Sequence, residues 1–524
     1  MFASETLVTD PDHWNLARIL NHCAERHADT VAVRHGGETM TYGELRDRSA
    51  RIARGFVDAG LGEGDRVCLH LRNGVPFLLA SWGGARAGLV VTPANPAYRE
   101  RELSYQLSHS DATAVVTNSD SLETVEETIA GIDREISVIV AEPTDEAKQT
   151  LDELAAAEPL DPVEQSPDDT VFQPYTSGTT GDPKGVLLTH RNFRIQIAQN
   201  LRRLELRGDP GQALLLLPMY HITGLLLMLS SIAGGQPLHL TQSESWDPIR
   251  VLEIIDEYPV TEFVGVATMF TDLLSTYDSE KYDVRSLDVT QQGGTKIPPR
   301  MQVEFEKSFG VSVMEGYGLT ETTAAALSSI DSSLGNRYGS AGQPTGHTRA
   351  KIIDEDGTTL PAGETGELLL AGPHVMKGYY DNKAKTRETM AENGFLRTGD
   401  IAERDEDNYY YIKGRKGNTI ITGGHNVYPT EVEDTLQNHP DIEDAVVFGL
   451  PHERKGETVV SAIEVGSDTT LEPDDVHEFV IDRLAPYKHP RAVEIHTELP
   501  RTGSGKVERA TLKERLSTKL DEDA

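Results

Sequence analysis

The chain has 524 residues, of which 49 are Lys or Arg and 84 are Asp or Glu, so its formal charge is 49 − 84 = −35. This balance excludes a protein built around a general nucleic-acid footprint, which needs a basic face. It also argues against docking on anionic lipid, which attracts polybasic segments. The length predicts about three structural units at roughly 100–200 residues each.

The acidity has a pattern of its own. The first lysine is Lys148, every earlier Lys or Arg position is Arg, and Asp and Glu are spread along the chain instead of forming a tail. Such a composition resembles that of halophilic proteins, in which net charge maintains solubility. We therefore expect a salt-adapted, haloarchaeal source; an ordinary acidic cytosolic enzyme is the alternative.

Several segments bear on location. Cys23 and Cys68 are too few for a disulfide framework, and the first residues lack the basic and apolar regions of a signal peptide. The uncharged stretch 210–243 is long enough to span a bilayer. However, its Pro218, Gly224 and Gly234 favour a buried strand, a turn and a helix. We expect a cytoplasmic protein without a transmembrane segment.

The first part of the chain alternates strand-like and helix-like patterns. Arg66–Leu71 reads as a buried strand, Val75–Ala87 as a helix, and Leu89–Thr92 and Ala112–Thr117 as further strands. This alternation predicts a parallel sheet with helices on its faces, and the rhythm continues to about residue 330. Short β runs follow over 346–413 and predict an antiparallel sheet or a small β-barrel-like subdomain.

A glycine-rich joint divides the chain. We expect a large α/β domain over residues 1–413, a hinge over 414–418, and a small mobile α+β domain over 419–524. Thr430 and Glu433 have the spacing of a capping box, which predicts a helix start there. A large and a small domain joined by glycines suggest motion between them.

The strongest chemical signal is the loop from Tyr175 to Gly185, which follows a predicted strand over Thr170–Gln173. Its glycines allow close backbone approach to a ligand, its hydroxyls add hydrogen-bond donors, and Lys184 adds charge, a combination that suits polyphosphate. A Walker A loop is excluded, because Lys184 precedes Gly185 instead of Ser or Thr. The loop residues expected to bind nucleotide are Thr176, Ser177, Gly178, Thr179, Thr180, Gly181 and Lys184.

This loop matches the signature of the adenylate-forming (AMP-binding) superfamily, and the chain resembles its acyl-CoA synthetase type. Further segments match in the family's order and extend over nearly the whole chain. They are Tyr42–Leu45, Pro93–Leu103, Pro218–Gly224, Tyr317–Glu321, Arg397–Asp400, Gly414–Arg415, Gly423–Gly424 and Pro500–Lys506.

The resemblance implies roles in catalysis. Activating a carboxylate with ATP brings two anions together, so charge must be neutralised in the transition state, and Lys506 would bridge the carboxylate and the α-phosphate. Glu321 would hold Mg²⁺, which takes oxygen ligands, and Thr320 would contact a phosphate oxygen. His221 would line the acyl pocket, although an isolated His is more often structural.

Nucleotide-binding roles are implied in the same way. Tyr317 would stack on adenine, with Gly293 and Gly294 allowing the backbone to approach the ring. Asp400 would accept both ribose hydroxyls, and Arg415 would support the ribose and phosphate. The glycine pair Gly423 and Gly424 would border a tunnel for the pantetheine arm of coenzyme A.

The implied reaction has two steps: a small-molecule carboxylic acid and ATP·Mg²⁺ give acyl-adenylate and pyrophosphate, and coenzyme A then gives acyl-CoA and AMP. Between them the small domain would rotate about Gly417, where the family more often has Lys or Asp. A medium- or long-chain fatty acid is the expected substrate. An aryl-CoA ligase, an acyl-AMP ligase that loads a carrier protein, and a silent nucleotide sensor stay open, as does a homodimer.

Overall fold

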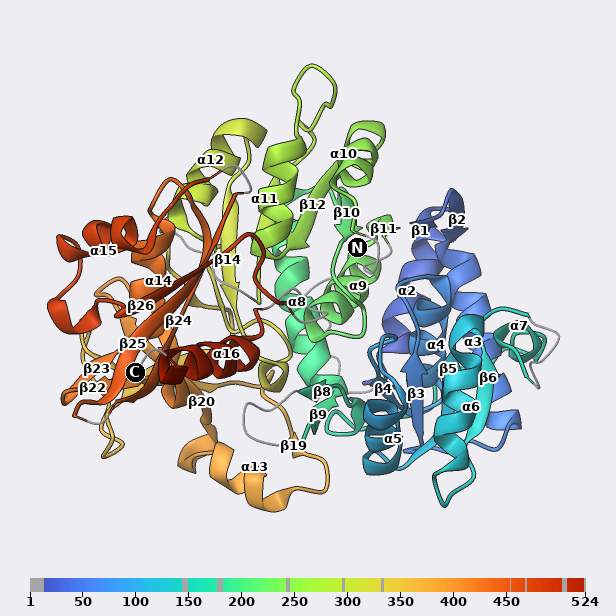
Figure 1. Ribbon diagram of the computed structural model, residues 1–524. Helices are drawn as coiled ribbons and strands as arrows, with labels where there is room; N and C mark the ends of the chain where they lie inside the picture. Colours follow the sequence, from blue (N-terminus) through green and yellow to red (C-terminus); the bar gives the residue numbers. More distant parts are fainter. Residues whose placement is uncertain are drawn as a thin grey trace.

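The computed structural model describes residues 14–143, 149–176, 182–241, 246–294, 297–330, 334–452, 454–466, 469–501 and 507–522. Figure 1 shows the N-terminal elements on one side of the molecule, the C-terminal elements on the other, and helices α8 and α9 between them. Across these ranges, no helix combines the length and the apolar character needed to cross a membrane.

The first large sheet has eight strands in the described part, with β8 paired to β9 beside the path β19-β9-β7-β4-β3-β5-β6. Its strands β7, β4, β3, β5 and β6 run parallel. The strands are β3 (Arg66–His70), β4 (Val90–Pro93), β5 (Ala112–Thr117), β6 (Ser137–Val140), β7 (Thr170–Phe172), β8 (Tyr175–Thr176), β9 (Lys184–Thr189) and β19 (Gly378–Tyr379).

Strand β3 shows why helices cover both faces of this sheet. Successive side chains point to opposite faces. Val67 and Leu69 join the main core with helices α3 and α4, whereas Cys68 packs with α5 and α6 on the other face. The predicted parallel sheet is confirmed. The helices are α2 (Ala17–His27), α3 (Tyr42–Asp58), α4 (Val75–Arg86), α5 (Glu100–His109), α6 (Leu122–Ala130) and α7 (Leu151–Leu154).

The second large sheet has the order β16-β15-β14-β13-β12-β10-β11-β1-β2, and its six strands from β14 to β1 run parallel. The uncharged stretch 210–243 forms β10, α9 and β11 here, which confirms a buried strand, turn and helix. The strands are β1 (Val31–His35), β2 (Glu38–Thr41), β10 (Gln212–Leu215), β11 (Leu238–Leu240), β12 (Val260–Gly265), β13 (Val289–Gln292), β14 (Val313–Tyr317), β15 (Leu327–Ser328) and β16 (Gln343–Pro344).

Two helix layers enclose the second sheet. Phe193 and Leu201 of α8 and Leu225 of α9 share one core with residues of both large sheets. The opposite face packs Phe263 and Val313 against α10, α11 and α12. The helices are α8 (His190–Arg207), α9 (Ile222–Gly234), α10 (Pro248–Glu257), α11 (Ala267–Thr276) and α12 (Pro299–Phe309).

The segment after residue 346 forms the expected antiparallel sheet, with the path β17-β18-β20-β21. Its bounds are β17 (Arg349–Ile353), β18 (Thr365–Ala371), β20 (Leu396–Arg404) and β21 (Tyr410–Arg415), with α13 (Lys383–Thr389) inserted before β20.

The C-terminal unit packs three helices around a mixed sheet. Strands β23, β22, β25 and β24 are antiparallel, and β26 pairs with β25 in parallel. The elements are β22 (Ile420–Thr422), β23 (His425–Val427), α14 (Pro429–Gln437), β24 (Ile442–His452), β25 (Gly456–Val465), α15 (Pro473–Ile481), β26 (Ala492–His496) and α16 (Arg509–Glu522).

The predicted capping box at Thr430 is wrong. The N-cap of helix α14 lies two residues earlier, at Tyr428, and provides no side-chain cap. Glu433 instead accepts hydrogen bonds from the Val447 backbone N–H (2.8 Å) and from Arg509 (2.6 Å). The carboxylate therefore ties α14 to β24 and α16. Thr430 and Glu433 have the spacing of a capping box, but the Glu433 carboxylate bonds to other elements instead of to the start of its own helix.

Candidate active site

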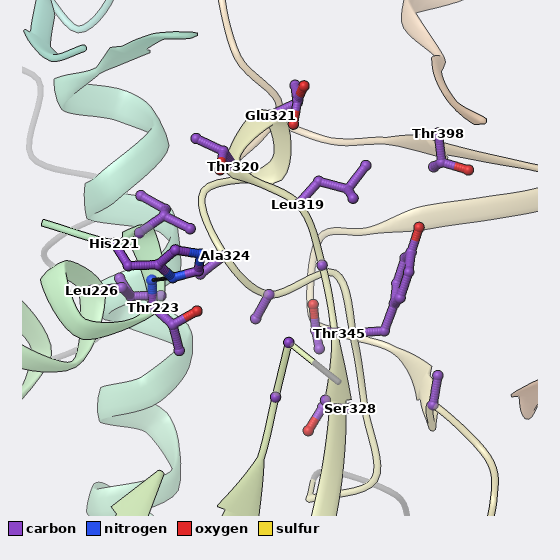
Figure 2. A pocket seen from close by; sticks show the side chains of 18 of the residues that line it. His221, Thr223, Leu226, Leu319, Thr320, Glu321, Ala324, Ser328, Thr345 and Thr398 are labelled. Carbon is purple, nitrogen blue, oxygen red and sulfur yellow. Dashed lines mark hydrogen bonds between the residues drawn. The ribbon is translucent and has the colours of Figure 1, made fainter. Parts of the chain in front are cut away.

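A large cavity of about 1180 Å³ opens where β12, β13 and β14 end. The carboxyl ends of parallel strands are the usual place for a ligand in an α/β sheet. The start of α9 lies on one side of the cavity, the loop after β14 crosses it, and β20 lies beyond (Figure 2). The site therefore combines segments that are far apart in the sequence.

Tyr317, Asp400 and Arg415 form one connected group in this cavity. The Tyr317 hydroxyl donates to Asp400 Oδ2 (2.5 Å), and Arg415 Nε lies 2.8 Å from Asp400 Oδ1. Asp400 and Arg415 are register partners on β20 and β21, which explains their contact. Burial, and then the Asp400 charge, raise the pKa of Tyr317 well above its usual value, so its hydroxyl stays a donor.

Glu321 has a second tyrosine as its partner. Tyr379 on β19 donates its hydroxyl to Glu321 Oε1 (2.7 Å). Burial, followed by the charge of Glu321, raises the pKa of Tyr379. The Lys184 ammonium lies 6.0 Å from the centre of the Tyr379 ring, and the described residues provide no ion-pair partner for it. Thr320, Glu321 and Lys184 all line the cavity.

The loop after Tyr317 has an unusual backbone. Thr323 and Ala324 have φ angles of 52° and 74°, which are costly for residues with a Cβ and are often found at functional sites. Gln196 of α8 holds this loop by donating to the carbonyl groups of Thr322 (2.9 Å) and Thr323 (3.1 Å). A Cβ on Gly318 would lie 1.4 Å from the Ala324 carbonyl oxygen, so only glycine fits there.

His221 caps helix α9 and also lines the cavity. Its Nδ1 accepts the Thr223 backbone N–H at 3.4 Å, the contact drawn in Figure 2. Gly224 is required by the same turn, because a Cβ there would lie 2.2 Å from the Pro218 carbonyl oxygen. His221 thus has both a structural role and a position in the candidate site.

The glycine pair after β13 leaves open space. An added Cβ would meet nothing within 4 Å at either Gly293 or Gly294, and Gly294 has a φ of 88°. Both residues line the cavity, so the backbone is accessible to a flat ligand there. Thr295 and Lys296, which follow the pair, lie outside the described residues.

The structure describes only the two ends of the signature loop. Thr176 and Lys184 are register partners on β8 and β9, so this pairing brings the loop ends together beside the cavity. The predicted site residues outside the described ranges are Ser177, Gly178, Thr179, Thr180, Gly181 and Lys506.

Gly423 and Gly424 lie apart from the main cavity. They form the turn between β22 and β23, with φ angles of 58° and 84°. Gly423 borders a separate cavity of about 240 Å³, whose lining includes Lys455 and Arg491. The glycine pair is therefore not brought to the cavity that holds Asp400 and Glu321 in this arrangement of the chain.

Several lining residues were missed by the sequence reasoning. Tyr379 lies outside the recognised motifs, and nothing in its local sequence marks it. Glu367 is buried and contacts Arg397 (3.0 Å), in the motif 397–400, and Lys416 (3.1 Å), in the expected hinge. Arg509 reaches the cavity from α16, and its position three residues after Lys506 was an available signal.

The cavity is less acidic than the chain. It is lined by six basic residues and six carboxylates, whereas the whole chain has 49 basic and 84 acidic residues. The basic residues are Lys184, Lys385, Arg397, Arg415, Lys416 and Arg509. This local balance favours a polyanionic ligand in spite of the chain's negative charge.

Comparison with known proteins gives matches over nearly the whole chain. The AMP-binding enzyme family matches residues 20–380, and the AMP-binding enzyme C-terminal domain matches residues 431–506. A long-chain-fatty-acid–CoA ligase of Escherichia coli O6:H1 is 33% identical over 98% of this chain and 97% of its own length. A feruloyl-CoA synthase of an Amycolatopsis species is 34% identical over 93% and 96%.

A solved structure agrees with these matches. The ATP-bound MatB from Rhodopseudomonas palustris is 28% identical and superposes with a TM-score of 0.87, covering 96% of this chain and 99% of that one. The family match extends over more than half of the chain, and the order of motifs agrees with it. This chain belongs to the AMP-binding enzyme family.

Proposed function

We propose that the chain is an AMP-forming acid–thiol ligase that converts a carboxylic acid, ATP and coenzyme A into acyl-CoA, AMP and pyrophosphate. One observation carries this proposal: the Tyr317–Asp400–Arg415 group and the Tyr379–Glu321 pair line one cavity at the carboxyl ends of a parallel sheet. The first suits a nucleoside and the second suits its phosphates. The names of two relatives, the long-chain-fatty-acid–CoA ligase and the feruloyl-CoA synthase, agree with this reaction.

The nucleoside end is formed by Tyr317, Asp400 and the glycine pair Gly293–Gly294. A carboxylate has about four acceptor positions, so Asp400 can accept two ribose hydroxyls while it keeps Tyr317 and Arg415 as partners. The open backbone at the glycine pair leaves room for the adenine ring opposite Tyr317. Arg415, whose side chain is 46% exposed, can present its outer guanidinium nitrogen to the phosphates while its Nε stays beside Asp400.

The phosphate end is formed by Lys184, Thr320 and Glu321, and the residues 177–181 would add to it. The donor set fits Mg²⁺, because a hard cation that arrives with ATP needs only one or two protein carboxylates. The described residues contain no cluster of three or more metal-binding side chains, which agrees with such sharing. Bound Mg²⁺ would neutralise phosphate charge; Glu321 would hold it, with Tyr379 orienting the carboxylate, and Lys184 would bind a phosphate oxygen.

The acid and the thiol enter at different places. The acid would lie beyond His221, between α8, α9 and the sheet, with its carboxylate facing the α-phosphate and Lys506 bridging the two. Gly423 and Gly424 would border the path of the pantetheine arm after the small domain, residues 419–524, rotates on the hinge at 414–418. The basic side chains Lys455 and Arg491 near that turn suit the phosphates of coenzyme A.

Finer assignments belong to the same proposal. A fatty acid used in lipid metabolism and an aromatic acid are both consistent with the relatives, and a carrier protein is the alternative thiol. A cytoplasmic location, a homodimer and adaptation to high salt complete the proposal. The intact Asp400 and Glu321 contacts favour an enzyme over a silent nucleotide sensor.

Two measurements test the reaction. Exchange of labelled pyrophosphate into ATP that depends on added acid reports the first step, and AMP release that needs coenzyme A reports the second. Formation of ADP and phosphate, or exchange that ignores the acid, would reject the ligase. Glu321→Gln should lower both rates, whereas Glu403→Gln on β20, outside the cavity lining, is the matched control.

A further inference from the structure

The part of the cavity that would receive the acyl group has polar side chains on opposite walls; this inference rests on the proposed function. Helices α8 and α9 form one wall and the face of β12 and β13 forms the other. A pocket for a plain hydrocarbon would be lined by apolar side chains on both. The identity of the polar groups therefore bears on the acid that binds.

The register of the sheet defines its wall. Val264 pairs with Gln291, and Glu262 pairs with Val289, so these four side chains share one face of β12 and β13. All four line the cavity. Strands rise about 3.3 Å per residue, so the Gln291 row lies roughly 3 Å inside the end of β13 and the Val289 row about 10 Å inside it. The Gln291 amide thus lies beside Val264 at the depth of the first carbons of an acyl group, while Val289 and Glu262, which accepts from Gln236 (2.9 Å), lie deeper.

The Gln291 amide can occupy this position only because Gly316 has no side chain. A Cβ added to Gly316 on the neighbouring strand would lie 2.6 Å from Gln291 Nε2. Gly316 therefore makes room for the amide. Within the described residues, no hydrogen-bond partner exists for this amide, although its two N–H groups and its oxygen can make several bonds.

The helix wall carries a second polar group between Leu204 and Leu227. Asn200 of α8 donates to the Ser230 hydroxyl of α9 at 2.9 Å, and both residues line the cavity. This contact uses one of the donors of Asn200. The amide oxygen and the second donor have no protein partner in the part of the chain that the structure describes. Two walls therefore offer unused hydrogen-bonding capacity to the same space.

We infer that Gln291 and Asn200 select an acid whose acyl group carries a hydrogen-bonding substituent, such as a hydroxyl, over the unsubstituted acid of the same size. The substituted acid can be aliphatic or aromatic, because Val264, Val289, Leu204 and Leu227 supply apolar contact to either. An unsubstituted acyl group displaces the water that solvates the two amides and gives them no replacement bond.

The expected discrimination follows from that loss. A site built to hydrogen-bond a ligand rejects the analogue without the polar group, because buried polar groups are left unpaired. With one or two such bonds, the preference should be about 10- to 100-fold in affinity. A pocket that only matches shape would distinguish the two acids far less, since an added hydroxyl is poorly rejected by apolar walls.

The test measures binding and turnover separately on the full chain. Calorimetry in the presence of a non-hydrolysable ATP analogue compares phenylpropanoate with its para-hydroxy derivative and hexanoate with its terminal-hydroxy derivative. Gln291→Leu keeps the volume and removes the amide, whereas Gln291→Asn retains an amide as the conservative control. Asn200→Leu tests the opposite wall independently, in case the first variant does not fold.

In the wild type, at least one hydroxylated acid should bind about 10-fold or more tightly than its partner. Gln291→Leu should reduce this ratio to near one, and Gln291→Asn should retain part of it. Equal binding in both pairs, tighter binding of the unsubstituted acids, or no binding of any acid would overturn the inference. Tight binding of a hydroxylated acid without AMP release would leave the selective pocket in place and reject the ligase reaction instead.

Discussion

Asp400→Asn removes one charge from the centre of the candidate nucleotide site and retains its shape. Asp400 is only 4% exposed, and its carboxylate accepts from Tyr317 and pairs with Arg415. A hydrogen bond to a charged group contributes about 1.5–3 kcal/mol. Two weakened ribose contacts should therefore cost about 3 kcal/mol, or roughly 100-fold in ATP affinity.

The fold should tolerate this change. The Asn amide can donate to the Tyr317 oxygen, and Arg415 can turn into solvent, so the loss of unfolding free energy should stay near 1–2 kcal/mol. Asp405→Asn is the matched control, because Asp405 follows on the same chain segment, pairs with Arg337 and lies outside the cavity. Its ATP affinity should change less than about threefold.

ATP and its dideoxy analogue, which lacks both ribose hydroxyls, distinguish the proposed role from a general loss of structure. The wild type should bind ATP roughly 100-fold more tightly than the analogue, and Asp400→Asn should bind both with similar weak affinity. Calorimetry gives the four dissociation constants. An Asp400→Asn variant that still prefers ATP by the full wild-type factor would refute ribose recognition by this carboxylate.

The remaining predictions concern the acid-activating lysine, the hinge, pH and salt. Lys506→Ala should nearly abolish acid-dependent pyrophosphate exchange but leave thioester formation from supplied acyl-adenylate largely intact; exchange at the wild-type rate would contradict this. Gly417→Pro should slow the second step more than the first, because proline restricts rotation at the joint, and equal effects on the two steps would reject the hinge. Burial, and then Arg194, lower the pKa of His190 to about 3, and its Nδ1 accepts the Leu16 N–H at 3.2 Å. Since the unfolded chain binds this proton at a pKa near 6.5, unfolding free energy should fall as pH decreases from about 6.5, by up to about 1.4 kcal/mol per pH unit for this group. Urea titrations of the wild type and His190→Gln should show the steeper decline in the wild type, and identical slopes would argue against it. Because the formal charge is −35, activity and stability should rise toward molar salt; a sharp optimum near ~0.1 M would argue against salt adaptation.

The sequence predicted the fold well where one periodicity dominated. The strand Ala112–Thr117 has the predicted bounds, and the uncharged stretch around α9 was correctly read as buried. Pro and Gly mark the turns in that stretch, so a continuous membrane helix was never favoured. Boundaries elsewhere moved by a residue or two, because tertiary contacts decide where strands stop pairing.

Tertiary use of polar side chains was harder to predict. Glu433 has cap spacing but binds Arg509 and β24, and Glu44, part of an early family motif, completes a capping box with Thr41 at the start of α3. The spacing alone cannot distinguish a capping carboxylate from one that makes tertiary contacts, because both stand at the same position near the start of a helix. Tyr379 was missed for a related reason: its partner Glu321 is 58 residues away.

The negative charge of the chain is unevenly distributed between the cavity and the rest of the molecule. Basic and acidic side chains are balanced around the cavity, although acidic residues dominate the sequence as a whole. Excess negative charge therefore lies mostly elsewhere, where it repels an incoming polyanion until salt screens it. Lys184 and Arg415 provide the local attraction that ATP and coenzyme A need.

The central claim is the two-step, AMP-forming ligation. The most direct measurement is product stoichiometry for the purified chain with ATP, Mg²⁺, coenzyme A and an accepted acid. The account predicts AMP, pyrophosphate and acyl-CoA in equal amounts, with no AMP when either the acid or the thiol is omitted under multiple turnover. Formation of ADP and phosphate, or AMP release that is unchanged without the acid, would contradict it.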